Sequence, residues 1–382
     1  MPLMPSLTDR VKSFALTIGF DLVGVAPATP TPYAFAYPSW LEKGYAGEMS
    51  YLARNAEKRQ DPRLVLPGAR SIIVGAVNYR PPETPPSAKS PTGVVARYAH
   101  GTDYHNVLHE KLDRLLAFIR TETGQLVNAK IYVDTGPILE RDLATRAGLG
   151  WYGKHTNLIH KRLGSWLLIG EILTDLTLEY DRPTTDHCGT CTRCLQACPT
   201  QAIVAPYQVD ARRCLSYLTI ELKDAIPEAY RDALGDRIFG CDDCQDVCPW
   251  NRRAPETDEP AFFSRSWTQT PDLVELLRWS PETFREKTKG SPVKRAKRRG
   301  LLRNVAVALG NTGDPTVVPP LITALSDEEP LVRGHAAWAL GKLGGDTARE
   351  ALRKAQTEET DPQTLREIDR AIEKIEKMPC SI

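Results

Sequence analysis

Cysteine spacing is the feature of this sequence that most limits how the chain can fold. Eight of the nine cysteines lie between Cys188 and Cys248, and only Cys380 lies outside that region. The first four follow the pattern C-x2-C-x2-C-x3-C-P, at positions 188, 191, 194 and 198. In a cytosolic chain, thiols gathered in this way are more often metal ligands than disulfide partners. We therefore expect a domain that folds around metal centres.

A second, shorter cysteine run completes the ligand set. Cys241, Cys244 and Cys248 precede Pro249 and leave this run one ligand short, and Cys214 is the available fourth thiol. In two-cluster ferredoxins the fourth cysteine of a run ligates the other cluster. The predicted ligands are Cys188, Cys191, Cys194 and Cys248 for cluster one, and Cys198, Cys214, Cys241 and Cys244 for cluster two.

Two other uses of these cysteines are a zinc ribbon and a disulfide knot. A zinc site takes four ligands of its own and gains nothing from a cysteine that crosses to another centre. We therefore predict a ferredoxin-like domain over residues 183–255 with two 4Fe-4S clusters. Two clusters in one small domain form a path for electrons, and that path needs a terminus.

The composition of the 382-residue chain is that of a globular protein, with 41% hydrophobic and 25% charged residues. The formal net charge is +1, so any surface that attracts nucleic acid must be a local basic cluster. The N-terminus lacks the basic and apolar segments of a signal peptide, and the best apolar run, SWLLIGEIL, is interrupted by Glu171. We expect a cytoplasmic protein without a membrane span.

Two further domains flank the cysteine region. Residues 1–182 alternate strand-like runs such as SIIVGAVNY with helical periodicity such as HNVLHEKLDRLLAFIRTE, which predicts an α/β domain. A proline-rich surface loop is expected at 80–93, and YDRPTTD leads into the cysteine domain. Toward the C-terminus ALGNTG at 308–313 recurs as ALGKLG at 339–344, which predicts α-helical HEAT-like repeats over 265–378.

The α/β domain has no nucleotide-binding motif, since neither G-x-G-x-x-G after a strand nor a P-loop occurs. Asp134, in DTGP, follows a predicted strand, where a site residue, an Asx turn and a helix cap are all consistent with the sequence. Gly150 and Gly153 flank two aromatic residues, as in a plain loop or in backbone packed on a flat cofactor. The segment ARYAHGTDYH gathers Arg97, Tyr98, His100, Asp103, Tyr104 and His105, and for its histidines a structural or solvated role is expected.

Eight segments spread over nearly the whole chain carry a resemblance to a known family. They are RYAHGTDYH, DTGPILERDLATRAGLGWYGKHTNLI, GSWLLIGEILTDL, CGTCTRCLQACPTQAI, DARRCLSYLTIE, FGCDDCQDVCPWN, KRRGLLRN and HAAWALGKLG. Together they resemble the epoxyqueuosine reductases, which are cobalamin-dependent iron–sulfur enzymes of tRNA modification. The resemblance is least distinctive in the first 40 residues.

The resemblance implies a reaction and its cofactors. A cobalamin held base-off between the N-terminal and cluster domains would serve a two-electron reduction of epoxyqueuosine, at the wobble position of tRNA, to queuosine. This is the last step of queuosine biosynthesis. The resemblance assigns the proton donor to Asp134, which would need a raised pKa near neutral pH, and burial against the corrin and the base could provide it. Arg141, and as a second candidate Tyr104, would orient the substrate.

The same resemblance implies binding residues. Cobalamin contacts are expected from Arg97, Tyr98, Asp134, Gly153, Leu158, Ser216 and Tyr217. The basic run SPVKRAKRRG fits a solvated helix start, but a tRNA substrate favours a phosphate-binding strip. Its residues are Lys294, Arg295, Lys297, Arg298, Arg299 and Arg303, which Arg212 and Arg213 would extend. The modified base should leave its stack to reach the cofactor. We also expect a monomer and an external low-potential electron donor.

Two alternatives belong to other classes of protein. A reductive dehalogenase acting on a small molecule would share cobalamin and two clusters, but such enzymes usually carry a twin-arginine export signal, which this sequence lacks. A non-enzymatic ferredoxin-type electron carrier fused to a HEAT adaptor would leave the N-terminal α/β domain unexplained.

Overall fold

The computed structural model describes residues 4–33, 35–82 and 91–377. Most of the proline-rich loop expected at 80–93, and Cys380, lie outside the described residues. The chain divides into two compact units. The first contains the described residues within 4–82, 102–212 and 242–263, and the second those within 91–101, 213–241 and 264–377. Each unit is described by itself.

A four-stranded antiparallel sheet forms the centre of the first unit, in the order β1-β2-β7-β4. The strands are β1 (Leu22–Pro27), β2 (Ser71–Asn78), β7 (Leu167–Thr174) and β4 (Ala129–Tyr132). Strands β2 and β7 are the inner pair, and β2 is buried along its whole length. Burial on both faces explains why both strands are almost continuously apolar in the sequence.

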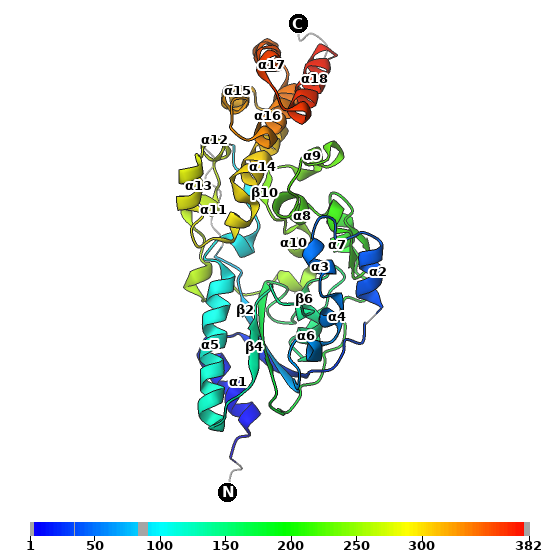
Figure 1. Ribbon diagram of the computed structural model, residues 1–382, viewed down its shortest axis with the longest axis vertical. Coiled ribbons are helices and arrows are strands. Elements are labelled where there is room, and N and C mark those ends of the chain that lie inside the picture. The colour runs from blue at the N-terminus through cyan, green and yellow to red at the C-terminus, as the bar shows by residue number, and fades with distance from the viewer. Residues whose placement is uncertain (1–3, 34, 83–90, 378–382) are drawn as a thin grey trace. The chain divides into compact units, whose positions relative to one another are not determined.

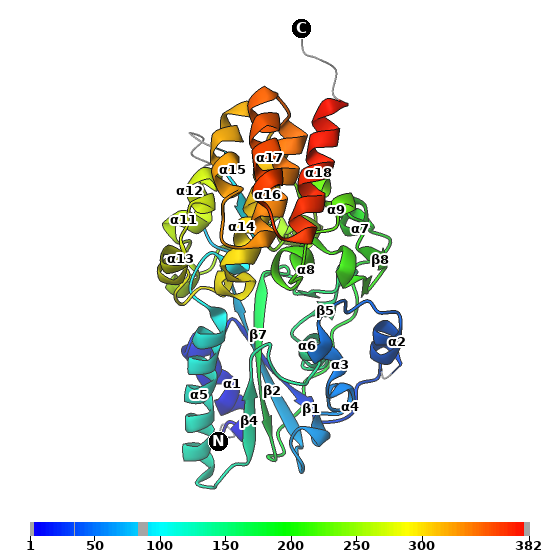
Figure 2. The ribbon, with the colours of Figure 1, turned by 45° about the horizontal axis from the view of Figure 1, so that its top comes forward.

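Helices cover both faces of this sheet, as Figures 1 and 2 show. On one face α1 (Leu7–Thr17) packs against α5 (Tyr104–Thr123), and their Phe14 and Phe118 rings stack at 4.1 Å. Gly170 of β7 faces α5, where a side chain would collide with Leu112. The other face packs against α6 (Glu140–Arg146) in a cluster that includes Val74, Leu143, Ile169 and Leu173.

The first unit also contains most of the cysteine region. Cys194 lies on α7 (Arg193–Ala197) and Cys244 on α10 (Asp243–Asp246), and these two short helices pack together. A buried hydrogen-bond network ties the second cysteine run to the chain just before β7. In it the Ser165 N–H donates to Asn251 Oδ1 at 2.7 Å, and the Ser165 hydroxyl donates to Gln245 Oε1 at 2.8 Å.

Short elements complete the first unit. They are α2 (Ala36–Glu42), α3 (Ser50–Ala53), α4 (Ala56–Gln60), β5 (Trp151–Tyr152), β6 (Leu158–Ile159), β8 (Ile203–Ala205) and β9 (Gln208–Val209). Strands β5 and β6 form a hairpin. The Trp151 ring of this hairpin meets the Trp250 ring edge-on at 5.0 Å, so the hairpin packs directly beside the second cysteine run.

Helices dominate the second unit, and three of them show what the sequence repeat does. Helices α14 (Lys297–Asn311), α16 (Pro330–Leu343) and α18 (Pro362–Glu376) pack in succession. Gly310 and Gly341 occupy the same place in the two copies of the repeat. A Cβ on Gly310 would lie 2.8 Å from Cβ of Ala339, and one on Gly341 would lie 2.6 Å from Cβ of Ala371. The repeated glycine therefore allows each helix to approach the next closely.

The remaining elements of the second unit are shorter than these three helices. They are β3 (Val94–Val95), α8 (Leu215–Ile220), α9 (Glu228–Leu234), β10 (Arg237–Phe239), α11 (Ser266–Gln269), α12 (Leu273–Leu277), α13 (Pro281–Lys287), α15 (Val318–Ala324) and α17 (Asp346–Glu358). The Asn304 side chain anchors α14 to this group through the carbonyls of Thr219 and Ile238, both at 2.8 Å. Among the described residues no helix combines the length and apolarity that crossing a membrane requires.

Candidate active site

Asp134 lies in the turn that connects β4 to α6, with its backbone in the left-handed region at φ 59°. An aspartate tolerates this conformation better than most residues do. The Asp134 N–H donates to Glu140 Oε1, which fixes the turn against the first residue of α6. The Asp134 side chain is 61% exposed, and the N-cap of α6 is Leu139. Its carboxylate therefore faces outward and does not cap the helix.

The start of α5 supplies the partners of this carboxylate. The Tyr104 hydroxyl donates to Asp134 Oδ2 at 2.9 Å, and His105 Nε2 lies 3.7 Å from the same oxygen. The other ring nitrogen of His105 lies 2.7 Å from Asp103 Oδ1. Burial lowers the pKa of His105, but Asp103 and Asp134 outweigh burial and bring this pKa to about 9. His105 is therefore an imidazolium between two carboxylates at neutral pH. The sequence predicted only a structural or solvated role for it, and these two ion pairs are the part of its role that was not predicted.

His100 behaves as expected from the sequence. Its Nε2 lies 2.9 Å from the Val95 carbonyl oxygen and its Nδ1 lies 3.0 Å from Ser264 Oγ, all within the second unit. Burial lowers its pKa. His100 is a structural histidine.

Three carboxyl groups of the site differ in protonation. The surrounding protein removes part of the water around Asp134 and raises its pKa, but the ion pair with His105 and the hydrogen bond from Tyr104 outweigh this effect, so the pKa lies below the ordinary value. The raised pKa expected of Asp134 depends on burial against a corrin and a base, so it stays a prediction. Burial, and then the charge of Asp134, instead raises the pKa of Glu140 to about 8. Burial, and then Glu140 and Asp134, raises the pKa of Glu171 well above the glutamate value.

Sequence reasoning missed Glu140 and Glu171 as members of the site. Glu171 is fully buried on the inner strand β7, and neither of its oxygens has a hydrogen-bond partner among the described residues. It alternates with Gly170, which faces α5, so it faces α6. The available signal was a single glutamate inside the apolar run SWLLIGEIL, which the sequence analysis used only to exclude a membrane span.

Arg141 and His155 are the two basic residues of the site, and only Arg141 is charged at neutral pH. Arg141 is exposed on α6, and its charge lowers the pKa values of Asp134 and Glu140 as a secondary effect. Burial, and then Arg141, lowers the pKa of His155 to about 4, so this imidazole is neutral. His155 Nδ1 accepts the Asn157 N–H at 3.2 Å, which places the proton on Nε2. That Nε2 is buried and has no hydrogen-bond partner among the described residues.

The residues expected to bind cobalamin are found in both units. Leu158 is only 2% exposed and belongs to the core beneath the sheet, so it does not present its side chain to a ligand in this structure. A Cβ on Gly153 would lie 2.5 Å from Ile159 Cδ1, and one on Gly150 would lie 2.2 Å from the Ile159 carbonyl oxygen. The β5–β6 hairpin itself therefore requires both glycines. Arg97, Tyr98, Ser216 and Tyr217 lie in the second unit.

The four cysteines assigned to cluster one all belong to the first unit. Burial, and then the neighbouring Cys248 and Cys188, raises the pKa of Cys194 to about 11. The pKa of Cys248 is raised by burial and then by Cys188 and Cys191. The charges of neighbouring thiolates thus act on both Cys194 and Cys248. Of the cluster-two cysteines, Cys198 and Cys244 belong to the first unit, and Cys214 and Cys241 to the second.

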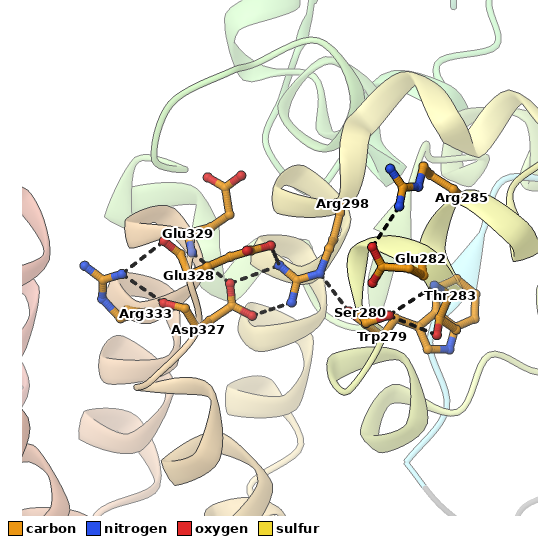
Figure 3. A network of polar contacts seen from close by, with 10 residues as sticks. All are labelled: Trp279, Ser280, Glu282, Thr283, Arg285, Arg298, Asp327, Glu328, Glu329 and Arg333. Carbon is orange, nitrogen blue, oxygen red and sulfur yellow. Dashed lines mark hydrogen bonds and ion pairs between the residues drawn. The ribbon is translucent and has the colours of Figure 1, made fainter.

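Two residues of the predicted basic strip have other roles, which corrects that prediction in part. Arg298 donates to Asp327 Oδ2 at 2.5 Å and to the Trp279 carbonyl oxygen at 2.7 Å (Figure 3). Its side chain is only 14% exposed. Arg303 is 1% exposed and donates to the carbonyl oxygens of Leu218, Leu222 and Asp224. Neither arginine is available to a phosphate in this structure.

The other basic residues of the strip are exposed: Lys294, Arg295, Lys297 and Arg299. Arg295 pairs with Glu221 at 3.0 Å. Lys297 has φ 61° and ψ 166°, a conformation that is strained for any residue but glycine. Arg212, in the first unit, pairs with Asp210 and lies over the Tyr45 ring, whereas Arg213 belongs to the second unit.

Comparison with known proteins gives consistent results along the chain. Residues 59–135 match the model of the epoxyqueuosine reductase QueG family, 187–251 match a 4Fe-4S double cluster binding domain, and 295–373 match HEAT repeats. The chain is 44% identical to an epoxyqueuosine reductase of Salmonella typhimurium over 88% of both chains. It is 42% identical to that of Escherichia coli over 88% of this chain and 89% of the relative. The predicted fold class is confirmed.

Two solved structures share this fold over nearly their full length. One is an epoxyqueuosine reductase with a tRNA-Tyr epoxyqueuosine-modified tRNA stem loop, at a TM-score of 0.91 and 34% identity, covering 97% of this chain and 99% of the other. The second is an epoxyqueuosine reductase from Bacillus subtilis with its aspartate catalytic loop swung out of the active site, at a TM-score of 0.90 and 33% identity, with the same coverage.

The crossed cysteine assignment leads to a test by iron content. The wild-type chain should hold about eight iron atoms, since each 4Fe-4S cluster contains four. The double variant Cys188→Ser/Cys248→Ser removes two ligands of one cluster and should keep about four iron atoms, because the second cluster is untouched. Cys188→Ser/Cys241→Ser should lose nearly all iron. Equal iron loss in the two double variants, or zinc in the wild type, would rule out the crossed assignment.

Proposed function

Because the chain belongs to the epoxyqueuosine reductase family, it is an oxidoreductase that acts on tRNA, and we propose that a bound cobalamin and the acid Asp134 serve its reaction. Reduction of epoxyqueuosine breaks both C–O bonds of the epoxide and leaves the alkene of queuosine. Two electrons and two protons enter, and one water leaves. The double-cluster domain provides the path for the electrons. Neither the dehalogenase nor the electron-carrier alternative is favoured, since relatives matching 88% of the chain are epoxyqueuosine reductases.

The residues around Asp134 fit a cobalamin in one specific respect. His155 Nε2–H is a buried donor without an acceptor among the described residues, and leaving it unpaired in an apolar site costs free energy. The peripheral amides of a corrin carry carbonyl oxygens that could accept a hydrogen bond from this N–H. We propose that Gly153, Asp134, Arg97, Tyr98, Ser216 and Tyr217 also contribute to the cofactor site. When bound, cobalamin would supply a strongly reducing centre next to the substrate.

The outward-facing carboxylate of Asp134 is the observation that carries the proposed mechanism. Tyr104 and His105 hold it from behind, through Oδ2, so its remaining oxygen can face a bound epoxide. Covering this carboxyl group with substrate would remove it from water and raise its pKa, which is what an acid needs. After proton transfer, Tyr104 and the His105 imidazolium would stabilise the carboxylate that forms. Arg141, exposed beside Asp134, is placed to orient the modified nucleotide.

The substrate and the electron donor require surfaces beyond this site. We propose that Lys294, Arg295, Lys297 and Arg299 bind phosphates of the tRNA, and that Arg298 and Arg303 support the start of α14 from within. The electrons would come from an external low-potential donor in the cytoplasm, and the chain would act as a monomer.

Replacement of Asp134 tests the proposed acid. Asp134→Asn keeps the shape of the side chain and tolerates φ 59°, so the turn should survive while the acid is lost. Single-turnover formation of queuosine, measured by mass, should fall by about 10²- to 10⁴-fold. Bound cobalamin, iron content and tRNA affinity should stay at wild-type levels. Wild-type turnover by this variant would remove Asp134 from the mechanism, whatever the behaviour of Asp134→Ala.

The basic strip is tested by the salt dependence of tRNA binding. Lys297→Gly/Arg299→Ala removes two exposed charges, and glycine suits the backbone at position 297. The slope of log affinity against log salt should decrease by close to two units, because each lost phosphate contact removes about 0.9. Arg298→Ala serves as the control, since Arg298 is paired with Asp327 and should change the slope little. An unchanged slope in the double variant would make these residues a solvated helix start.

A further inference from the structure

A hollow lies on the surface of the first unit where the two short helices of the cysteine region meet. It has a volume of about 450 Å³ and is lined by Arg193, Gln196, Ala197, Asp246, Val247 and Arg252. These residues come from α7, from α10 and from the turn after Cys248. The hollow lies entirely within one unit and is separate from the residues around Asp134.

The lining of this hollow is adjacent in sequence to two ligands of cluster one and to one ligand of cluster two, since Ala197 precedes Cys198. Arg193 precedes Cys194 and Val247 precedes Cys248, and both cysteines are buried. Cluster two includes Cys214, which is two residues from the proposed cobalamin contact Ser216. Cluster two is therefore assigned to the cofactor end of the electron path, and cluster one to the entry. An incoming electron carrier needs a surface next to cluster one, and the hollow provides one.

Charge indicates what kind of carrier fits there. Arg193, Arg252 and the neighbouring Arg253 are exposed. Asp246 is the carboxylate of the lining. Arg193 and Arg252 line the hollow against the single carboxylate of Asp246, and Arg253 follows Arg252 in the sequence, so the lining carries a net positive charge. Such a charge accelerates the approach of an acidic partner and orients it.

We propose that this hollow docks the external electron donor, and that the donor is a small acidic electron-transfer protein of low potential. The donor is oxidised by one electron per encounter and a cluster is reduced, so two encounters supply the two electrons that one epoxide consumes. This inference rests on the proposed cluster assignment and electron donor, but not on the role of Asp134.

Charge reversal in the holoenzyme tests the docking surface. The probe is a reduced acidic 2Fe-2S ferredoxin, and the measurement is bleaching of the enzyme's clusters in a stopped-flow instrument without tRNA. Arg193→Glu/Arg252→Glu should slow this reduction by about tenfold or more at low salt, and added salt should narrow the difference. Reduction by photoreduced deazaflavin, a small uncharged donor, should match the wild type. Arg349→Glu/Arg353→Glu, on exposed sites of α17, makes the same charge change away from the clusters and should have no effect.

Two outcomes would overturn the proposal. One is an unchanged rate with ferredoxin in the charge-reversed variant. The other is an equal loss of rate with ferredoxin and with deazaflavin, which would show damage to cluster one and no docking effect. Because no tRNA is present, failure of the proposed epoxide chemistry would leave these rates unaltered, and the two failures can be told apart.

A second inference comes independently from the carboxyl groups beneath Asp134. Glu171 is fully buried, lies opposite Val74 and Tyr132 in the sheet, and has two oxygens without partners among the described residues. A carboxylate cannot remain charged and unpaired in such a place, so Glu171 carries a proton. Glu140, which accepts the Asp134 N–H, and Asp134 itself are the carboxyl groups that act on it.

We infer that Glu140 and Glu171 hold the second proton of the reaction. Asp134 gives the first proton to the oxygen that leaves carbon, and becomes a carboxylate. Formation of water from that oxygen needs one more proton, which the Glu140–Glu171 pair returns to the site. The groups that bias this pair are Asp134, His105 on α5 and Arg141 on α6. The inference rests on the proposed role of Asp134.

Replacement of Glu171 separates proton storage from structure. Glu171→Leu removes an unpaired buried carboxyl group, so it should raise the melting temperature, and Glu171→Gln keeps the shape without the acid. In both variants single-turnover queuosine formation should fall by tenfold or more as pH rises from about 6 to about 8, whereas the wild type should lose little over this range. Bound cobalamin and tRNA affinity should not change.

Stability against pH gives a readout that needs no substrate. The folded-state pKa of Glu140, about 8, lies above the ordinary glutamate value of 4.5, so folding takes up a proton. The contribution of Glu140 to the free energy of unfolding is therefore fully present below about pH 4.5 and is lost as pH rises through about 8. Glu140→Gln should remove this part of the pH dependence. Wild-type pH profiles for both Glu171 variants would overturn the inference. Wild-type turnover by Asp134→Asn would instead show that Asp134 does not donate the first proton. The proposed role of Glu140 and Glu171, which depends on that step, would then fail with it.

Discussion

The buried hydrogen-bond network of Ser165, Gln245 and Asn251 is the constraint on which the first unit depends. It joins the loop before β7 to the segment that carries Cys244 and Cys248. Asn251 also donates to the Gln245 carbonyl oxygen at 2.7 Å, and Gln245 reaches the Tyr79 hydroxyl at 3.2 Å. Buried amides that are fully paired fix one geometry, because any displacement leaves a polar group unsatisfied. The network thereby fixes the position of β7, which carries Glu171, relative to the segment that carries Cys248.

Opposite pKa shifts within a few side chains show how the proton chemistry is arranged. His105 is driven toward its charged form and Asp134 toward carboxylate, whereas Glu140 and Glu171 are kept neutral. The difference follows from partners. Asp134 has a hydrogen bond from Tyr104 and an ion pair with His105, and the carboxyl oxygens of Glu171 have no hydrogen-bond partner among the described residues. One site thus contains a charged imidazolium, a carboxylate and two protonated carboxyl groups, a combination that suits a reaction consuming two protons.

The features that the sequence could predict are those that depend on spacing. Cysteine intervals indicated the cluster domain, and the interval between Gly310 and Gly341 indicated the repeat, because ligand geometry and helix contact both impose fixed intervals. Glu140 and Glu171 were missed, and a structural or solvated role was predicted for His105, since the roles of these residues come from neighbours on other elements. Leu158 was assigned to the cofactor although it packs in the core, because a motif match does not show which way a side chain points. The sign of the Asp134 shift likewise required its partners.

Arginine shows most clearly why a run of charge does not define a surface. Within SPVKRAKRRG and the turn that follows, Arg298 closes an ion pair with Asp327, and Arg303 holds three carbonyl oxygens from inside the unit. The guanidinium group does this well, because its five donors form a rigid fork and it stays charged when buried. Arg193 and Arg252 instead belong to no basic run in the sequence, and the fold of the cysteine region brings them together at one hollow. Exposure and pairing, which only the fold determines, therefore decide which cations can meet an anionic partner.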